Sequence, residues 1–319
     1  MIKTVEQYLE SLNDGREVWC LGEKVKDVRT HPSTSTIIQM AAMDYVLPNH
    51  PDYKHLFVTK DKDGEDINFL LTSPKTPEDM LRRRECYMVG MRSGGGVLVH
   101  CMGADALAAF SVAAEVMDKK LGTNYMERVE KYRTYLQKND LALTGAITDV
   151  KGDRMLRPAD QPNPGAYVHI KEKLKDGIVV EGCKVHISEA SVADEVLVVP
   201  TRALREQDKD YAVAFAVPGD AEGVIHVNDS ACAKRTSFTS DKMIFPAPKL
   251  RATHAFISPI GPAPRTSTVS PGCRLHCCSE FTAQLTGSDN AACSGGRSPG
   301  GLMTWPFGSA NDGITTYSA

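Results

Sequence analysis

The sequence lacks any apolar run long enough to cross a membrane. No stretch reaches the roughly 18 consecutive apolar residues that a spanning helix needs. The first 15 residues, MIKTVEQYLESLNDG, mix charged and apolar residues and do not form the continuous apolar core of a signal peptide. These absences predict a soluble, cytoplasmic protein without a membrane partner.

The sequence also lacks an excess of positive charge. It has 37 lysines and arginines against 40 aspartates and glutamates, and its net charge is -3. A nucleic-acid partner would require clustered positive charge, because binding depends on neutralising phosphates. The one dense basic run, LRRRE at 81–85, follows PEDM at helical spacing, which favours a solvated helix face over a nucleic-acid patch. We therefore expect no nucleic-acid partner.

Cysteines at paired spacing are missing as well. The count of nine is odd, and Cys20, Cys86, Cys101, Cys183 and Cys232 are scattered through apolar surroundings. In a reducing compartment such residues are free thiols that mostly fill the core.

Lysine is absent after Lys249. Residues 250–319 have few large aliphatics and are rich in Gly, Ser, Pro, Thr and Cys, without helical or strand periodicity, so they cannot bury enough apolar surface to order themselves. Three interpretations compete: a disordered tail, a Cys/His metal module at CRLHCC (273–278), and an out-of-frame or mis-spliced continuation. No second ligand pair at finger-like spacing supports a metal. The loss of every lysine favours the out-of-frame reading.

Helical signals dominate residues 1–140 of this 319-residue chain, which is long enough for at least two domains. Thr4 with Gln7 forms a capping-box pattern, STSTIIQMAAMDYVL predicts a second helix, and Thr76 followed by Pro77 is a helix start. The segment 97–117, VLVHCMGADALAAFSVAAEVM, is apolar nearly all round. It predicts a central, buried helix.

Strand signals begin at about residue 142. AYVHIKEKL and GIVVEGCKVHIS flank KDG as the arms of a hairpin, and DEVLVVPT, YAVAFAVPG and GVIHVN follow at short, turn-separated intervals. Segregated helices and strands predict an α+β, multi-domain chain, with a helical domain at 1–140 and a β domain at 141–249.

The junction between the two parts reads TGAITDVKGDRMLRP, at 144–158. One interpretation is a polar turn in which Gly152 supplies the backbone freedom and the charged residues face water. The other is a site where backbone N–H groups and Lys151 or Arg154 hold an anionic cofactor group at a domain junction. Residue chemistry alone leaves both open.

Three blocks carry a resemblance to a known family: YLESLNDGREVWCLGEKVKDVRTHP, the long ungapped stretch from LTGAITDVKGDRMLRP to DEVLVVPT, and DKDYAVAFAVPGDAEGV. In order and spacing they resemble the 4-hydroxyphenylacetate 3-hydroxylase family, closest to its 4-hydroxybutyryl-CoA dehydratase branch, over roughly residues 5–235. The resemblance implies an acyl-CoA dehydrogenase-like fold: a helical N-terminal domain, a middle β domain and a C-terminal helical bundle, with FAD held mainly between the last two. It also implies a homotetramer and a flavin-dependent oxidoreductase acting on an acyl-CoA, hydroxy-acid or phenolic small molecule.

Two segments match the family's flavin contacts. In KVHIS, Ser188 stands where the family usually has a threonine whose hydroxyl approaches the flavin N5 edge, and His186 matches as well. A hydroxyl there can hydrogen-bond the flavin and tune its electronics. No catalytic residue is assigned. The first segment comprises Ile147, Thr148, Asp149, Lys151, Gly152, Asp153 and Arg154.

Departures from the family are equally specific. Relatives in the dehydratase branch hold a [4Fe-4S] cluster through a Cys-x-x-x-Cys pair and a later His and Cys; here Val97 replaces the first cysteine, only Cys101 remains, and no later match exists. We therefore expect no cluster. The missing similarity after about Lys249 predicts a truncated or frameshifted product without the helical bundle, with an incomplete β domain, weak or absent FAD binding and doubtful tetramer formation. A non-catalytic remnant with a disordered tail is the alternative function.

Overall fold

The computed structural model describes residues 1–94, 99–150, 152–175, 177–229, 240–245 and 254–257. Every described residue belongs to one compact unit, Met1–Ala263. The division of this unit into domains at residue 140 stays a prediction.

Helix starts predicted from capping signals are confirmed. Helix α1 (Val5–Ser11) begins after Thr4 and α4 (Pro77–Ser93) after Thr76, each with a reciprocal capping box that satisfies first-turn N–H groups. The helix expected in STSTIIQMAAMDYVL is α2 (Pro32–Asn49). The other helices are α3 (Lys54–Phe57), α5 (Val99–Leu121) and α6 (Tyr125–Asn139), with short 3-10 helices at η1 (Phe69–Leu71), η2 (Pro158–Asp160), η3 (Pro164–Ala166), η4 (Ala190–Val192) and η5 (Glu206–Tyr211).

Helix α5 is not buried on all sides, so that prediction is wrong. Leu107 and Ala114 are buried against the rest of the unit, whereas Val112 is 65% and Val116 45% exposed on another face. The helix therefore carries more apolar surface than its neighbours in the described part of the chain cover. Composition alone does not reveal which faces of an apolar helix find a partner.

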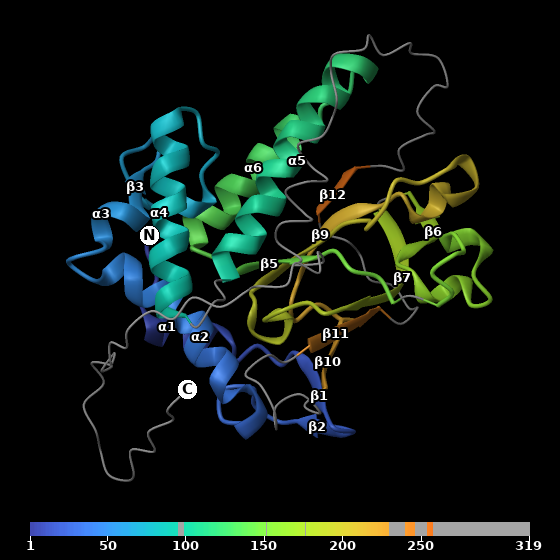
Figure 1. The fold of residues 1–319 in the computed structure, drawn as a ribbon, viewed down its shortest axis with the longest axis horizontal. Coiled ribbons are helices and arrows are strands. Elements are labelled where there is room, and N and C mark those ends of the chain that lie inside the picture. Colours follow the sequence, from blue (N-terminus) through green and yellow to red (C-terminus); the bar gives the residue numbers. More distant parts are fainter. Residues whose placement is uncertain (95–98, 151, 176, 230–239, 246–253, 258–319) are drawn as a thin grey trace, which may run out of the picture. The chain divides into compact units, whose positions relative to one another are not determined.

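Two sheets form the β part of the unit (Figure 1), and the predicted hairpin and strands are confirmed. A small separate hairpin pairs β3 (Val58–Lys60) with β4 (Asp66–Asn68). The strand order of the six-stranded sheet is β2 (Glu23–Val25), β1 (Glu17–Cys20), β10 (Ile225–Asp229), β11 (Ser240–Phe245), β7 (Gly177–Val185) and β6 (His169–Leu174). The strand order of the four-stranded sheet is β12 (His254–Ile257), β9 (Ala214–Pro218), β8 (Glu195–Val198) and β5 (Leu143–Ala146).

Five strands lie where none was expected: β1, β2, β3 and β4 within the predicted helical range 1–140, and β12 within 250–319. Strands β1 and β2 fall inside the predicted helical range, and β1 pairs in parallel with β10, so these N-terminal residues complete the six-stranded sheet. Val18 and Cys20 alternate with less buried neighbours, a short period-2 pattern that the sequence does contain. Strand β12 lies within 250–319 and pairs with β9. The other tail predictions, CRLHCC among them, lie outside the described residues.

Strand β5 is covered on both sides. Ala146 packs into the apolar core that includes Val180 of β7 and Val196 of β8, whereas Leu143 packs with Leu107 of α5 in a second core. Helices α5 and α6 contact each other and cover this second face (Figure 1). Strand β5 is therefore held in place by packing on both faces up to its last residue.

Gly103 allows α5 to approach β5 closely. A Cβ atom at this position would lie 2.0 Å from the carbonyl oxygen of Leu143, whereas one at Gly145, in the same interface, would lie 3.7 Å from the Ala106 Cβ atom. The first distance is far shorter than real contacts and the second is an ordinary contact. Glycine at 103 is thus a condition of the observed helix–strand packing.

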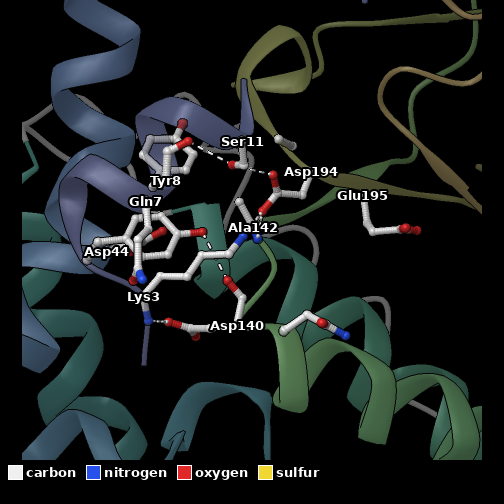
Figure 2. Close-up of polar contacts among 12 residues, drawn as sticks. Lys3, Gln7, Tyr8, Ser11, Asp44, Asp140, Ala142, Asp194 and Glu195 are labelled. Atoms are coloured by element: carbon white, nitrogen blue, oxygen red, sulfur yellow. Dashed lines mark hydrogen bonds and ion pairs between the residues drawn. The ribbon is translucent and has the colours of Figure 1, made fainter. Parts of the chain in front are cut away.

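A partly buried polar network fixes the point where the chain enters β5 (Figure 2). Asp194 accepts hydrogen bonds from the Lys3 ammonium (2.9 Å), the Ser11 hydroxyl (3.0 Å) and the backbone N–H of Ala142 (2.9 Å). The carboxylate of Asp140 accepts from the backbone N–H of Lys3 at 2.9 Å. These bonds connect the first residues of the chain to the start of β5.

Among the described helices, none combines the length and the apolar character needed to cross a membrane.

Candidate functional site

The first predicted flavin segment begins where β5 ends. Its first side chain, Ile147, is 43% exposed, and Thr148 is half-buried. Ala146, one residue earlier, is fully buried. Because packing holds β5 on both faces, the residues that leave the buried strand start from a fixed position and present apolar and hydroxyl groups at the surface.

The two predicted flavin segments lie side by side, although Asp149 and Lys184 are 35 positions apart in the sequence. Asp149 forms an isolated antiparallel bridge with Lys184, the N–H of Val185 donates to the carbonyl of Thr148 at 2.8 Å, and the N–H of Val150 donates to that of Cys183 at 3.3 Å. The Thr144 hydroxyl donates to the carbonyl oxygen of Ser188 at 3.1 Å. The structure therefore brings the stretch around Ile147 and Thr148 beside the end of β7.

The second segment has an unusual backbone. His186 and Glu189, on either side of Ser188, have φ angles of 57° and 63°, in the left-handed region that residues with side chains adopt at a cost. His186 is exposed, and Ser188 is half-buried. Such strained residues persist where the surrounding structure holds them, and they are enriched at ligand sites.

Asp149 is buried and already has partners. Its carboxylate forms an ion pair with the Lys184 ammonium at 2.5 Å and accepts a hydrogen bond from the Thr201 hydroxyl at 2.6 Å. The cavity beside these three residues measures about 10 Å³, which is room for roughly one water molecule. This cavity is therefore too small for a cofactor.

The loop that follows is organised around Gln161. The Gln161 amide oxygen accepts from the N–H of Asp153 at 3.1 Å, and its nitrogen donates to the Asp153 carbonyl at 2.7 Å. A Cβ atom at Gly152 would lie 2.4 Å from the same Gln161 oxygen, so the glycine lets the loop pass close to this side chain. The Asp153 carboxylate accepts from the N–H of Met155 at 2.8 Å. Arg154 is exposed, and Lys151 lies outside the described residues.

Three residues of this site were not predicted: Gln161, Lys184 and Thr201. Lys184 carried a usable signal, because it follows Val180 and Gly182 at alternate positions on one face of the strand, and all three are buried. A lysine on the inward face of a strand requires a buried partner. Thr201 and Gln161 sit in polar loops, where sequence offers no comparable signal.

Residues of α5 do not fit an iron–sulfur cluster. Cys101 is a free, buried cysteine, and burial raises the pKa of its thiol to about 12, which disfavours the thiolate that ligates iron. Val97 has no donor atom and lies outside the described residues. Within the residues that the structure describes, no group of three or more His, Cys, Asp or Glu side chains could hold a metal ion. The absence of a cluster stays a prediction.

Comparison with known proteins identifies a matching family and several similar proteins. The family described as 4-hydroxyphenylacetate 3-hydroxylase N terminal matches residues 4–255. The chain is 38% identical over 230 residues to the 4-hydroxybutyryl-CoA dehydratase/vinylacetyl-CoA-Delta-isomerase of Clostridium aminobutyricum, covering 71% of this chain and 47% of that protein. It is 32% identical over 225 residues to the 4-hydroxyphenylacetate 3-monooxygenase oxygenase component of Thermus thermophilus, covering 70% and 46%. The chain thus spans about half the length of the curated relatives it matches.

Solved structures agree with the sequence relatives. The 4-hydroxybutyryl-CoA dehydratase from N. maritimus superposes with a TM-score of 0.71 at 25% identity, over 80% of this chain and 55% of that one. The oxygenase component HpaB in complex with FAD superposes with a TM-score of 0.67 at 26% identity, over 81% and 56%. The neighbours share the acyl-CoA dehydrogenase-like fold predicted from the sequence, whereas the predicted absence of a C-terminal bundle stays unconfirmed.

Proposed function

This chain belongs to the 4-hydroxyphenylacetate 3-hydroxylase family, and we propose that it forms the part of a flavin-dependent oxidoreductase that holds FAD along 147–154 and 186–188. The observation that carries the proposal is the pairing of these two segments through Asp149 and Lys184 at the end of β5. A relative of similar fold is known in complex with FAD.

The chemistry of the exposed groups fits a flavin dinucleotide. Ile147 offers apolar surface to a ring, and the hydroxyls of Thr148 and Ser188 offer hydrogen bonds to its polar edge. The exposed guanidinium of Arg154 can neutralise a phosphate. A bound flavin would supply electron transfer, and these side chains would orient it and tune its electronics.

We infer a small organic substrate of one of two classes. Named relatives act on 4-hydroxybutyryl-CoA or on 4-hydroxyphenylacetate, which makes an acyl-CoA thioester or a phenol the candidate. Higher identity to the dehydratase favours the acyl-CoA class, while Val97 argues against the cluster chemistry of that branch. The comparisons give no support to the alternative of a non-catalytic remnant.

We expect weak but saturable FAD binding by this chain. The described site offers the cofactor one exposed wall, and a ligand that keeps much of its surface in water gains little affinity. Equilibrium dialysis with FAD up to about 1 mM, a concentration that detects binding of only about 4 kcal/mol, is the test. Failure to reach saturable binding in this range would refute the proposed function.

Arg154→Ala should weaken FAD binding about tenfold, because a guanidinium–phosphate hydrogen bond contributes roughly 1.5–3 kcal/mol. Arg128→Ala, which removes an exposed arginine from α6, is the matched control and should leave the dissociation constant unchanged. If both substitutions weakened FAD binding equally, Arg154 would act only through the net charge of the chain. If neither changed the dissociation constant, Arg154 would not contact the cofactor.

A further inference from the structure

Lys184 lies at the centre of the contacts beneath the flavin segment. Its ammonium group donates to the carbonyl of Ile147 at 2.9 Å and to the carbonyl of Val199 at 2.7 Å, and it pairs with Asp149 at 2.5 Å. The side chain is 1% exposed. An ammonium has three N–H bonds, and here three acceptors surround it, so Lys184 has no donor left for a ligand.

Thr201 holds the same segment through its hydroxyl group. The backbone N–H of Asp149 donates to the Thr201 hydroxyl oxygen at 3.2 Å. The hydroxyl hydrogen faces two acceptors at 2.6 Å, the carbonyl of Ile147 and the carboxylate of Asp149. Thr201 follows the end of β8, so β7 and β8 both attach to the three residues that leave β5.

We propose that Lys184 and Thr201 are positioning residues for the flavin: through Asp149 and the Ile147 carbonyl they fix the backbone at 147–149, whose exposed side chains contact the cofactor. This inference rests on the proposed function. Lys184 is enclosed and out of reach of a ligand. Thr201 is exposed, but its hydroxyl is engaged with the segment itself. Each acts by lowering the number of conformations that the segment must give up when FAD binds.

The charges in this group are balanced. Burial lowers the pKa of Lys184, and the adjacent Asp149 carboxylate opposes that effect by favouring the ammonium. Removing only the lysine would leave the Asp149 carboxylate buried without its counter-ion, which destabilises folded proteins. A test with Lys184 alone would therefore mix loss of folding with loss of positioning, and Thr201 supplies the cleaner variant.

Thr201→Val is the decisive substitution because it keeps the shape of the side chain and removes its hydroxyl. Using the full chain and equilibrium dialysis, we expect Thr201→Val to weaken FAD binding about tenfold and Thr201→Ser, which keeps the hydroxyl, to stay within about twofold of the unaltered chain. The absorption spectrum of bound flavin should shift in Thr201→Val and return in Thr201→Ser. A role limited to folding would change the urea midpoint and leave the spectrum of bound flavin unaltered.

A second pair of variants keeps the inference falsifiable. Lys184→Met should weaken FAD binding by about tenfold or more at a temperature where circular dichroism shows that the variant is folded. The control is Lys171→Met, which removes the lysine of a partly exposed ion pair between β6 and Glu181 and should leave FAD binding unchanged. If Thr201→Val and a folded Lys184→Met bind FAD as the unaltered chain does, with the same spectrum, the positioning role is wrong and the flavin site stands. If the unaltered chain binds no FAD, both proposals fall.

Discussion

Gly103→Ala lowers the free energy of unfolding by about 3 kcal/mol, because the added methyl cannot fit between α5 and β5. Its Cβ atom would lie 2.0 Å from the carbonyl oxygen of Leu143 and 2.5 Å from the side chain of the same residue. Backbone in a packed strand cannot move aside as a flexible side chain can, so the helix and strand must separate. Urea denaturation followed by circular dichroism measures the loss.

Gly145→Ala is the matched control for this prediction. The residue lies in the same helix–strand interface, and its added Cβ atom would be 3.7 Å from the Ala106 Cβ and 3.8 Å from the Met102 carbonyl oxygen. We expect a change smaller than about 1 kcal/mol. Similar unfolding free energies for Gly103→Ala and Gly145→Ala would show that α5 and β5 are not packed as described.

Glu195→Gln makes the protein more stable at pH 8 by roughly 3 kcal/mol and changes its stability little at pH 4. Burial raises the pKa of the Glu195 carboxyl from its ordinary 4.5 to about 7, with Tyr132 and Tyr135 opposing the shift and Asp194 and Asp220 adding to it. The folded state therefore keeps the proton that the unfolded state releases. The stability that this proton provides is complete below about pH 4.5 and is lost as the pH rises through 7.

Glutamine removes this dependence because its amide does not titrate and can still accept a hydrogen bond from the Tyr132 hydroxyl, which now donates to Glu195 at 3.0 Å. Urea unfolding at pH 4, 6 and 8 is the measurement, with exposed Glu206→Gln as the control. Parallel pH profiles for Glu195→Gln and the unaltered chain would contradict the prediction.

Local sequence patterns predicted the elements that local chemistry determines. Thr4 and Thr76 begin helices because their side chains satisfy N–H groups a few residues away, and the pairing of β6 with β7 follows from the alternating pattern of two neighbouring segments. Pairing between distant strands is different. Nothing near Glu17–Cys20 indicates that its partner is β10, some 200 residues later, because that choice depends on the whole sheet.

The candidate site divides along the same line. Resemblance supplied the two segments, and Ile147, Thr148, His186 and Ser188 lie at the surface where a ligand could reach them. The resemblance did not show that the Asp149 carboxylate forms an ion pair with Lys184 and a hydrogen bond with Thr201, because those contacts depend on strands that meet only in the folded chain. A buried aspartate with two partners differs from an exposed ligand contact, and only three-dimensional packing distinguishes them.

Amide hydrogen exchange with and without FAD tests the central claim most directly, because it shows where on the chain the cofactor binds. Mass spectrometry of peptides at saturating FAD should show slower exchange in peptides that cover 147–154 and 184–188, with no change in α4 (Pro77–Ser93), which contributes no residue to the site. Saturable FAD binding that leaves both site peptides unchanged, or protects a different part of the chain, would contradict the assignment of these segments to the flavin.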